Sequence, residues 1–76
     1  MIKEFNSAEK SSTIHSSSYD TETRLLTVHF KHNTSYIYKQ VPLETYEAFE
    51  LADSKGTAFR NLFYNLYEYT KLVHSV

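Results

Sequence analysis

Alternation of apolar and polar residues predicts a β-hairpin near the middle of the chain. In the stretch RLLTVHF, Leu26, Val28 and Phe30 occupy every second position, which is the pattern of a strand with one buried face. The stretch TSYIYKQ follows after KHN and is rich in residues that favour strands. The serine-rich segment before the hairpin contains few apolar residues, and we predict a weak edge strand over residues 12–19.

The length of the hairpin loop decides which face of the sheet the tyrosines occupy. A two-residue turn would place Tyr36 and Tyr38 opposite to the apolar face of the first strand and would expose them. A three-residue loop, with Asn33 in the left-handed conformation, would pair Val28 with Tyr36 and Leu26 with Tyr38. We favour the three-residue loop because it brings the large side chains of both strands to one face. Both tyrosines are then predicted to be core residues.

Two helices are predicted after the hairpin. Pro42 stands at the start of the first helix, acidic residues occupy its early turns, and Gly56 follows its end. A second helix is predicted over residues 57–70, where apolar residues recur at helical spacing. Its apolar seam consists of Phe59, Leu62, Phe63, Leu66 and Thr70. The predicted fold is α+β, a three-stranded antiparallel β-meander followed by two α-helices packed on the tyrosine face (β-β-β-α-α).

Length and composition narrow the class of protein. The chain has 76 residues, and we expect a flexible or loosely docked arm at 1–10, one domain at 11–71 and a tail at 72–76. Aromatic residues make up 16% of the chain, so a few large rings should supply most of the core. The chain has no cysteine, which excludes disulfides and suits a cytoplasmic protein. No apolar run approaches the roughly 20 residues that span a bilayer, and we expect no cofactor.

Charge is segregated along the chain although the net charge is only -1. Residues 23–41 contain basic and no acidic side chains, whereas residues 42–54 contain acidic and no basic side chains. A near-neutral total argues against strong nonspecific binding to nucleic acid, which depends on many phosphate contacts. A local basic surface could still steer a weakly bound partner.

A candidate nucleic-acid-binding stripe lies on the predicted second helix. Arg60, Tyr64, Tyr67 and Lys71 are spaced at i, i+4, i+7 and i+11, which places them side by side on a helix. Cations bind phosphates and tyrosine rings stack on unpaired bases, so this combination could bind a single strand of RNA or DNA. The alternative is that Tyr67 borders the core and the other three form an ordinary solvated face.

A different set of residues would serve a protein partner. Leu25 and Ile37 are predicted to lie on the sheet face away from the helices, where the N-terminal arm, a second protomer or a target protein could cover them. Glu44, Glu47 and Glu50 form an acidic stripe on the first helix, which could dock on a basic surface or simply stabilise the helix. The oligomeric state, monomer or homodimer, is left open. Nothing resembles a nucleophile elbow or a pair of catalytic carboxylates, so we expect a non-enzymatic protein.

An ordered series of short motifs resembles the KTSC domain. These motifs, over about residues 11–69, are SSTI, SSSYD, LTVHF, YIY followed by VP, ADSKGTAF, and finally Tyr67 with Tyr69. This family occurs at the carboxyl end of some lysyl-tRNA synthetases and as small stand-alone proteins of bacteria and phages. The resemblance implies a role in binding RNA and no catalytic residues.

Departures from the family pattern bear on that role. Asn33 stands where the family often has glycine, and asparagine tolerates the left-handed conformation better than most residues. Arg60, Phe63 and Tyr64 stand where the family tends to show asparagine, isoleucine and arginine. The arginine has therefore moved by four residues. The expected function is a small RNA-binding or single-strand-binding module; the alternative is a protein-interaction factor, for example a phage protein that binds or inhibits a host enzyme.

Overall fold

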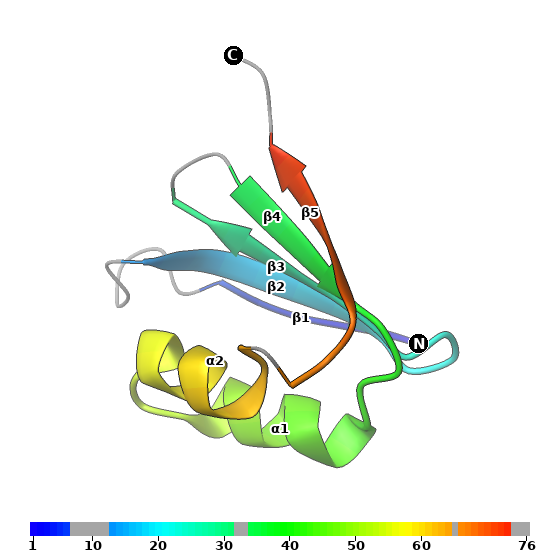
Figure 1. Ribbon diagram of the computed structural model, residues 1–76. Helices are drawn as coiled ribbons and strands as arrows, with labels where there is room; N and C mark the ends of the chain where they lie inside the picture. The colour runs from blue at the N-terminus through cyan, green and yellow to red at the C-terminus, as the bar shows by residue number, and fades with distance from the viewer. Residues whose placement is uncertain (7–12, 32–33, 65, 74–76) are drawn as a thin grey trace.

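Five strands and two helices make up the fold. The structure is a computed structural model that describes residues 1–6, 13–31, 34–64 and 66–73. The elements are β1 (Ile2–Asn6), β2 (Ile14–Asp20), β3 (Leu25–Phe30), β4 (Thr34–Tyr38), α1 (Leu43–Leu51), α2 (Lys55–Leu62) and β5 (Tyr69–Val73). The strands form one antiparallel sheet in the order β1-β2-β3-β4-β5. Both helices lie on the same face of this sheet, between β4 and β5 in the chain (Figure 1).

The predicted hairpin register is confirmed. Leu26 pairs with Tyr38 and Val28 with Tyr36, so both tyrosines point to the face that the helices cover. Tyr38 is 2% exposed. Tyr36 is partly buried and its ring lies 5.3 Å from that of Phe30. The predicted left-handed residue Asn33 lies outside the described residues.

The α+β class and the two helices on one face are confirmed, but the sheet has five strands rather than three. Residues 2–6 form β1, which pairs with residues 16–20 of β2. The serine-rich strand that was predicted at an edge is therefore β2, an inner strand between β1 and β3. Phe5 gives β1 its anchor, since its ring lies 5.1 Å from that of Phe49 on α1. Burial of one aromatic ring stabilises a strand whose sequence shows little alternation.

The second helix is shorter than predicted. It ends at Leu62 rather than at residue 70, and Phe63 departs from helical geometry with φ -125° and ψ -37°. Phe63 is fully buried, with its ring 5.6 Å from that of Tyr38. The chain then returns as β5, which pairs with the open edge of β4. Pairing the backbone groups of an exposed sheet edge outweighs the helical spacing of the apolar residues.

The two helices meet at a short connection. Ala52 caps α1, and Gly56 lies in the first turn of α2 instead of following the end of α1. The Ser54 hydroxyl accepts a hydrogen bond from the backbone N–H of Thr57 at 3.4 Å, as a helix-capping serine does. Of the described residues, none belongs to a helix long and apolar enough to cross a membrane.

Stacked aromatic rings hold the first helix to the sheet. Tyr46 of α1 is fully buried, and its ring lies 4.8 Å from that of Tyr19 with an interplanar angle of 11°. The Tyr46 and Ser17 hydroxyls lie 3.5 Å apart, and the Tyr19 hydroxyl donates a hydrogen bond to the Val41 carbonyl. Burial raises the pKa of both tyrosines, which therefore stay protonated at neutral pH. Each buried hydroxyl has a hydrogen-bond partner, so burial of the stacked tyrosines leaves no polar group unsatisfied.

Gln40 adopts a backbone conformation that residues with a Cβ disfavour. Its φ is 57°, in the left-handed region, just before the Val41 N–H donates to the Arg24 carbonyl at 3.0 Å. We expect Gln40→Gly to raise the free energy of unfolding by up to about 1 kcal/mol, because relief of the left-handed strain exceeds the extra entropy of glycine in the unfolded chain. Urea denaturation measures the change. The control is Lys39→Gly, where φ is not positive; an equal loss of stability in both variants would contradict the prediction.

Candidate functional site

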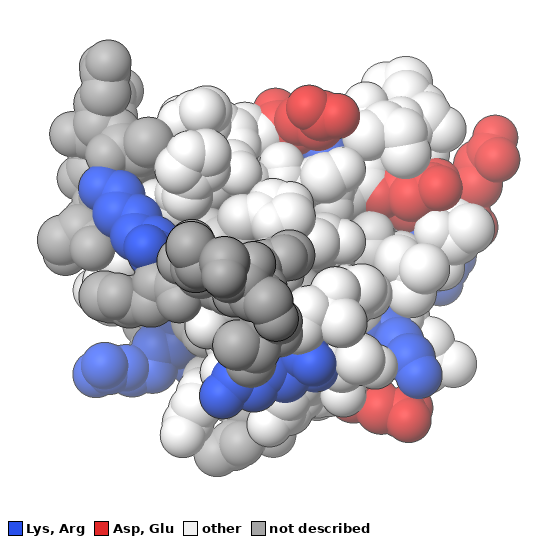
Figure 2. Space-filling view, turned by 90° about the horizontal axis from the view of Figure 1, so that it is seen from above, with Lys and Arg blue, Asp and Glu red and all other residues white. Residues whose placement is uncertain are grey.

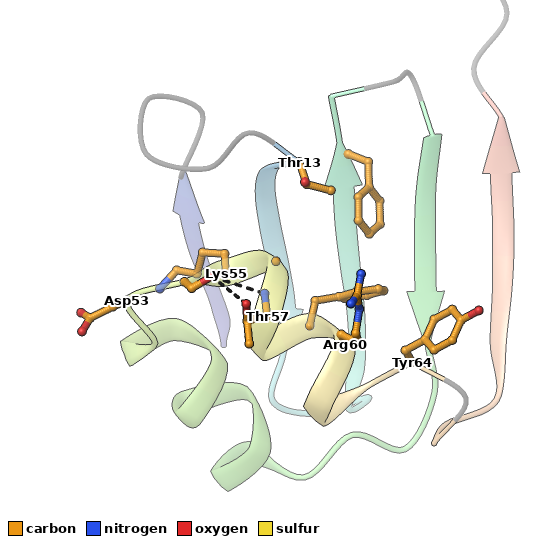
Figure 3. A pocket seen from close by; sticks show the side chains of 10 residues that line it. Thr13, Asp53, Lys55, Thr57, Arg60 and Tyr64 are labelled. Carbon is orange, nitrogen blue, oxygen red and sulfur yellow. Dashed lines mark hydrogen bonds between the residues drawn. The ribbon is translucent and has the colours of Figure 1, made fainter.

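Two adjoining hollows open on the helix-covered side of the sheet. The larger, which we call the polar hollow, has a volume of about 700 Å³ and is shown in Figure 3. Its lining residues are Thr13, Phe30, Asp53, Ser54, Lys55, Gly56, Thr57, Phe59, Arg60 and Tyr64. The smaller, which we call the aromatic hollow, has a volume of about 300 Å³. It is lined by Phe30, Thr34, Tyr36, Tyr38, Phe59, Tyr64, Tyr69 and Lys71.

Three aromatic side chains belong to both hollows. Phe30 on β3, Phe59 on α2 and Tyr64 after α2 line each of them. The rings of Phe30 and Phe59 lie 5.0 Å apart in an edge-to-face arrangement. The two hollows are therefore neighbouring parts of one surface feature, which we call the groove.

The aromatic hollow is built by neighbouring strands at one edge of the sheet. Tyr38 and Tyr69 are opposite each other in the β4–β5 pair, and their rings lie 5.5 Å apart. The ring of Tyr36 lies edge-to-face with Tyr69 at 5.3 Å. The Lys71 Nζ lies 6.0 Å from the centre of the Tyr36 ring, within the range of a cation–π contact. Flat rings and one cation thus line the same small space.

Tyr38, at the base of the aromatic hollow, is a neutral phenol. Burial raises the pKa of Tyr38, and the neighbouring hydroxyls of Tyr36, Tyr69 and Tyr64 raise it further. The Tyr38 phenol therefore stays protonated well above neutral pH. Tyr64 and Tyr69 are exposed at the surface, so a flat ligand could reach their rings from solvent.

Arg60 supplies the polar hollow with a positive charge. Figure 3 shows its side chain extending from α2, in front of β3 in this view, while Tyr64 points toward β5. Asp53 also lines the hollow, at its far end, and points away from Arg60. Within the described residues, no ion pair involves Arg60. Its guanidinium is thus available to an anion.

Lys55 has a structural role although it lines the polar hollow. Its ammonium donates hydrogen bonds to the Glu50 and Ala52 carbonyls, at 2.5 and 2.7 Å. It also lies 5.0 Å from the centre of the Phe5 ring. A lysine at this place satisfies the last carbonyls of α1 and the negative end of its dipole. Arg60 is therefore the better candidate for contact with a ligand.

The predicted nucleic-acid-binding residues do not form a stripe on one helix, and that prediction is wrong in its geometry. Arg60 lies in α2, Tyr64 and Tyr67 follow its end, and Lys71 lies in β5. Three of the four residues, Arg60, Tyr64 and Lys71, nevertheless line the groove. Tyr67 is absent from the lining and packs on Phe63 with ring centres 5.9 Å apart. The β5–β4 pairing brings Lys71 to the site.

Sequence reasoning missed Tyr69 and Phe59 as groove residues. The helical spacing predicts Tyr69 at the end of a helix and Phe59 in the apolar seam of that helix. The signal in the sequence is the alternation in YTKLV, which puts Tyr69 and Lys71 on the same face of a strand. The sequence does not mark Phe59 as a groove residue, because its side chain is only 9% exposed and also belongs to the core.

The residues predicted for a protein partner fall on two separate surfaces. Leu25 and Ile37 lie on the sheet face away from the helices, and β1 extends the sheet beside β2 instead of covering them. Glu44, Glu47 and Glu50 belong to α1, on the opposite side. Glu47 Oε2 lies 4.0 Å from Lys3 Nζ, an exposed ion pair of little energetic weight. No common interface joins the two sets.

Charges of both signs are mixed over the surface. Seen from above in Figure 2, Lys and Arg side chains gather mainly at the left and lower edges, and Asp and Glu side chains mainly toward the top and right. No group of three or more His, Asp or Glu within the described part of the chain is arranged to hold a metal ion. The charged residues that line the groove are three cations, Lys55, Arg60 and Lys71, and one carboxylate, Asp53.

Comparison with known proteins defines the class. The KTSC domain family model matches residues 10–69, and the chain belongs to the KTSC domain family. A solved structure, the crystal structure of a KTSC domain protein from Yersinia pestis, is similar to this chain with a TM-score of 0.83. The two are 28% identical, and the match covers 95% of this chain and 99% of the Yersinia pestis chain. The search of curated proteins gave no match.

Proposed function

We propose that this KTSC domain is a non-enzymatic module that binds single-stranded nucleic acid, RNA in particular, in the groove. The observation that carries the proposal is the aromatic hollow, which the exposed side chains of Tyr64 and Tyr69 line together with Lys71. Proteins bind single strands by stacking bases on aromatic rings while cations hold the backbone. Arg60 provides a second cation in the adjoining polar hollow.

The proposed binding is weak and selective for unpaired bases. With a net charge of -1, the protein cannot rely on a broad positive field, so stacking must supply much of the affinity. A duplex keeps its bases stacked inside and offers no free ring to the groove. A single strand offers both rings and phosphates.

Salt dependence tests the role of the two cations. We expect titration of a fluorescent eight-nucleotide RNA to give an affinity whose logarithm falls with log salt at a slope of about -1.4, because two cations each neutralise one phosphate of a single strand. Lys71→Ala should flatten the slope by about 0.7 and weaken binding to all sequences alike.

The matched control is Lys39→Ala. This change removes the same charge from a residue that follows β4 and lines neither hollow, where Lys39 Nζ lies 4.0 Å from Glu68 Oε1. The slope of the control should equal that of the parent. Absence of binding by the parent at low salt would refute the proposal and favour a protein partner; an equal effect of both lysines would move the site away from the groove.

A further inference from the structure

The two ends of the groove differ in chemistry. The aromatic end presents the rings of Tyr36, Tyr38 and Tyr69. The polar end presents hydroxyl groups and the Arg60 guanidinium. A ligand that fills the groove must therefore carry a flat apolar group at one end and an anionic, hydrogen-bonding group at the other.

Tyr64 marks the boundary between the ends. It follows α2, lines both hollows and has 60% of its surface exposed. Its backbone N–H donates to the Phe59 carbonyl at 3.2 Å, which fixes the backbone of Tyr64 relative to the last turn of α2. The Tyr64 ring can therefore contact groups placed in either end.

The dimensions of the groove limit how much of a strand it can hold. The aromatic hollow, at about 300 Å³, is less than half the volume of the polar hollow, at about 700 Å³. Tyr38 and Phe59 are nearly completely buried and close its floor, so the space suits one ring system. The polar hollow has room for a larger unit that includes a sugar and a phosphate.

We infer that the groove holds one two-nucleotide step of a single strand. One unpaired base lies in the aromatic hollow, the phosphate between the two nucleotides contacts Arg60, and the adjacent nucleotide occupies the polar hollow with its base against Tyr64. This inference rests on the proposed function and adds the size and arrangement of the bound unit. Asp53 lies at the far end of the polar hollow and points away from Arg60, so its charge does not face that phosphate.

The test uses eight-position RNA strands in which most bases are missing. One strand carries two adjacent uracils, and a second carries two uracils separated by three abasic positions, so both have the same charge and composition. The adjacent pair should bind about 5- to 150-fold more tightly than the separated pair, because stacking of one base is worth about 1 to 3 kcal/mol. Tyr64→Ala should reduce the difference between the two strands to less than about twofold.

An RNA strand with all eight bases distinguishes failure of the two-nucleotide step from failure of the proposed single-strand binding. If the complete strand binds while the adjacent and separated pairs bind equally, the two-nucleotide step is wrong and the single-strand-binding function stands. If the complete strand fails to bind at low salt, the proposed function is wrong and the inference falls with it. A complementary duplex of the same length should bind at least 5-fold more weakly than the complete strand.

Discussion

Replacing Tyr46 by alanine is expected to remove about 3 to 5 kcal/mol from the free energy of unfolding, the range for truncation of a buried aromatic side chain. The ring is fully buried, stacks on Tyr19 at 4.8 Å and approaches Phe5 at 6.3 Å. Its loss leaves a cavity between α1 and the sheet. Because a small domain has only a few kcal/mol of net stability, the variant should be largely unfolded at 37 °C. Urea denaturation followed by circular dichroism measures the loss.

Tyr46→Phe is the matched variant for the hydroxyl. It keeps the stacked ring and removes only the contact with the Ser17 hydroxyl, at 3.5 Å. The expected cost is about 1 kcal/mol, the typical contribution of one hydrogen bond. A cost of less than about 1 kcal/mol for Tyr46→Ala would show that the stack on Tyr19 contributes little to folding.

Tyr64→Ala is expected to weaken RNA binding by about 1 to 3 kcal/mol while leaving the melting temperature nearly unchanged. The side chain is 60% exposed and lines both hollows, so its removal deletes a stacking surface and little buried area. Fluorescence anisotropy with the eight-nucleotide RNA measures binding. A thermal melt measures stability.

Tyr67→Ala provides the contrast within the same segment. Tyr67 is partly buried against Phe63 and is not among the groove-lining residues. Its truncation should lower the melting temperature and leave the affinity of the folded protein for RNA unchanged. If Tyr64→Ala binds RNA like the parent, the groove is not the binding site and the search for the site moves to another surface.

The central hairpin was predictable because two independent signals agree. Leu26 and Val28 alternate with polar residues, and a three-residue loop then sets Tyr36 and Tyr38 on the same face. One-residue changes of register would expose every large side chain, so the buried face specifies the pairing strongly. Local pattern and global packing point to the same arrangement there.

The end of the chain was misread because its local pattern agrees with two structures. Apolar residues continue at helical spacing past Leu62, yet the same segment contains Tyr69 and Thr70, which favour strands. The segment forms a strand rather than a helix because it pairs with the edge of β4, and a single sequence gives no direct indication of that long-range pairing. The candidate site has the same error: Arg60, Tyr64 and Lys71 are predicted from the sequence, but the surface that joins them with Tyr69 depends on β5.

β1 escaped prediction for a different reason. Of its residues, Phe5 alone packs against the core, and a single ring does not produce a recognisable alternation over five residues. The energetic gain comes from tertiary contact with α1 and from backbone pairing with β2. Neither is visible in composition or local propensity.

The order of the strands and helices along the chain leads us to expect that the groove forms late in folding. Every strand pairs with its neighbour in the chain, but β1 to β4 follow one another without an intervening helix, whereas both helices lie between β4 and β5. Closing such a long loop is entropically unfavourable until the rest of the structure is in place. We therefore expect β5 to dock late and, as an edge strand, to be among the elements that open locally in the native state. Because β5 carries Tyr69 and Lys71, transient opening of one edge strand would dismantle the aromatic hollow while the buried rings of the core stay packed, and ligand would in return hold that edge closed.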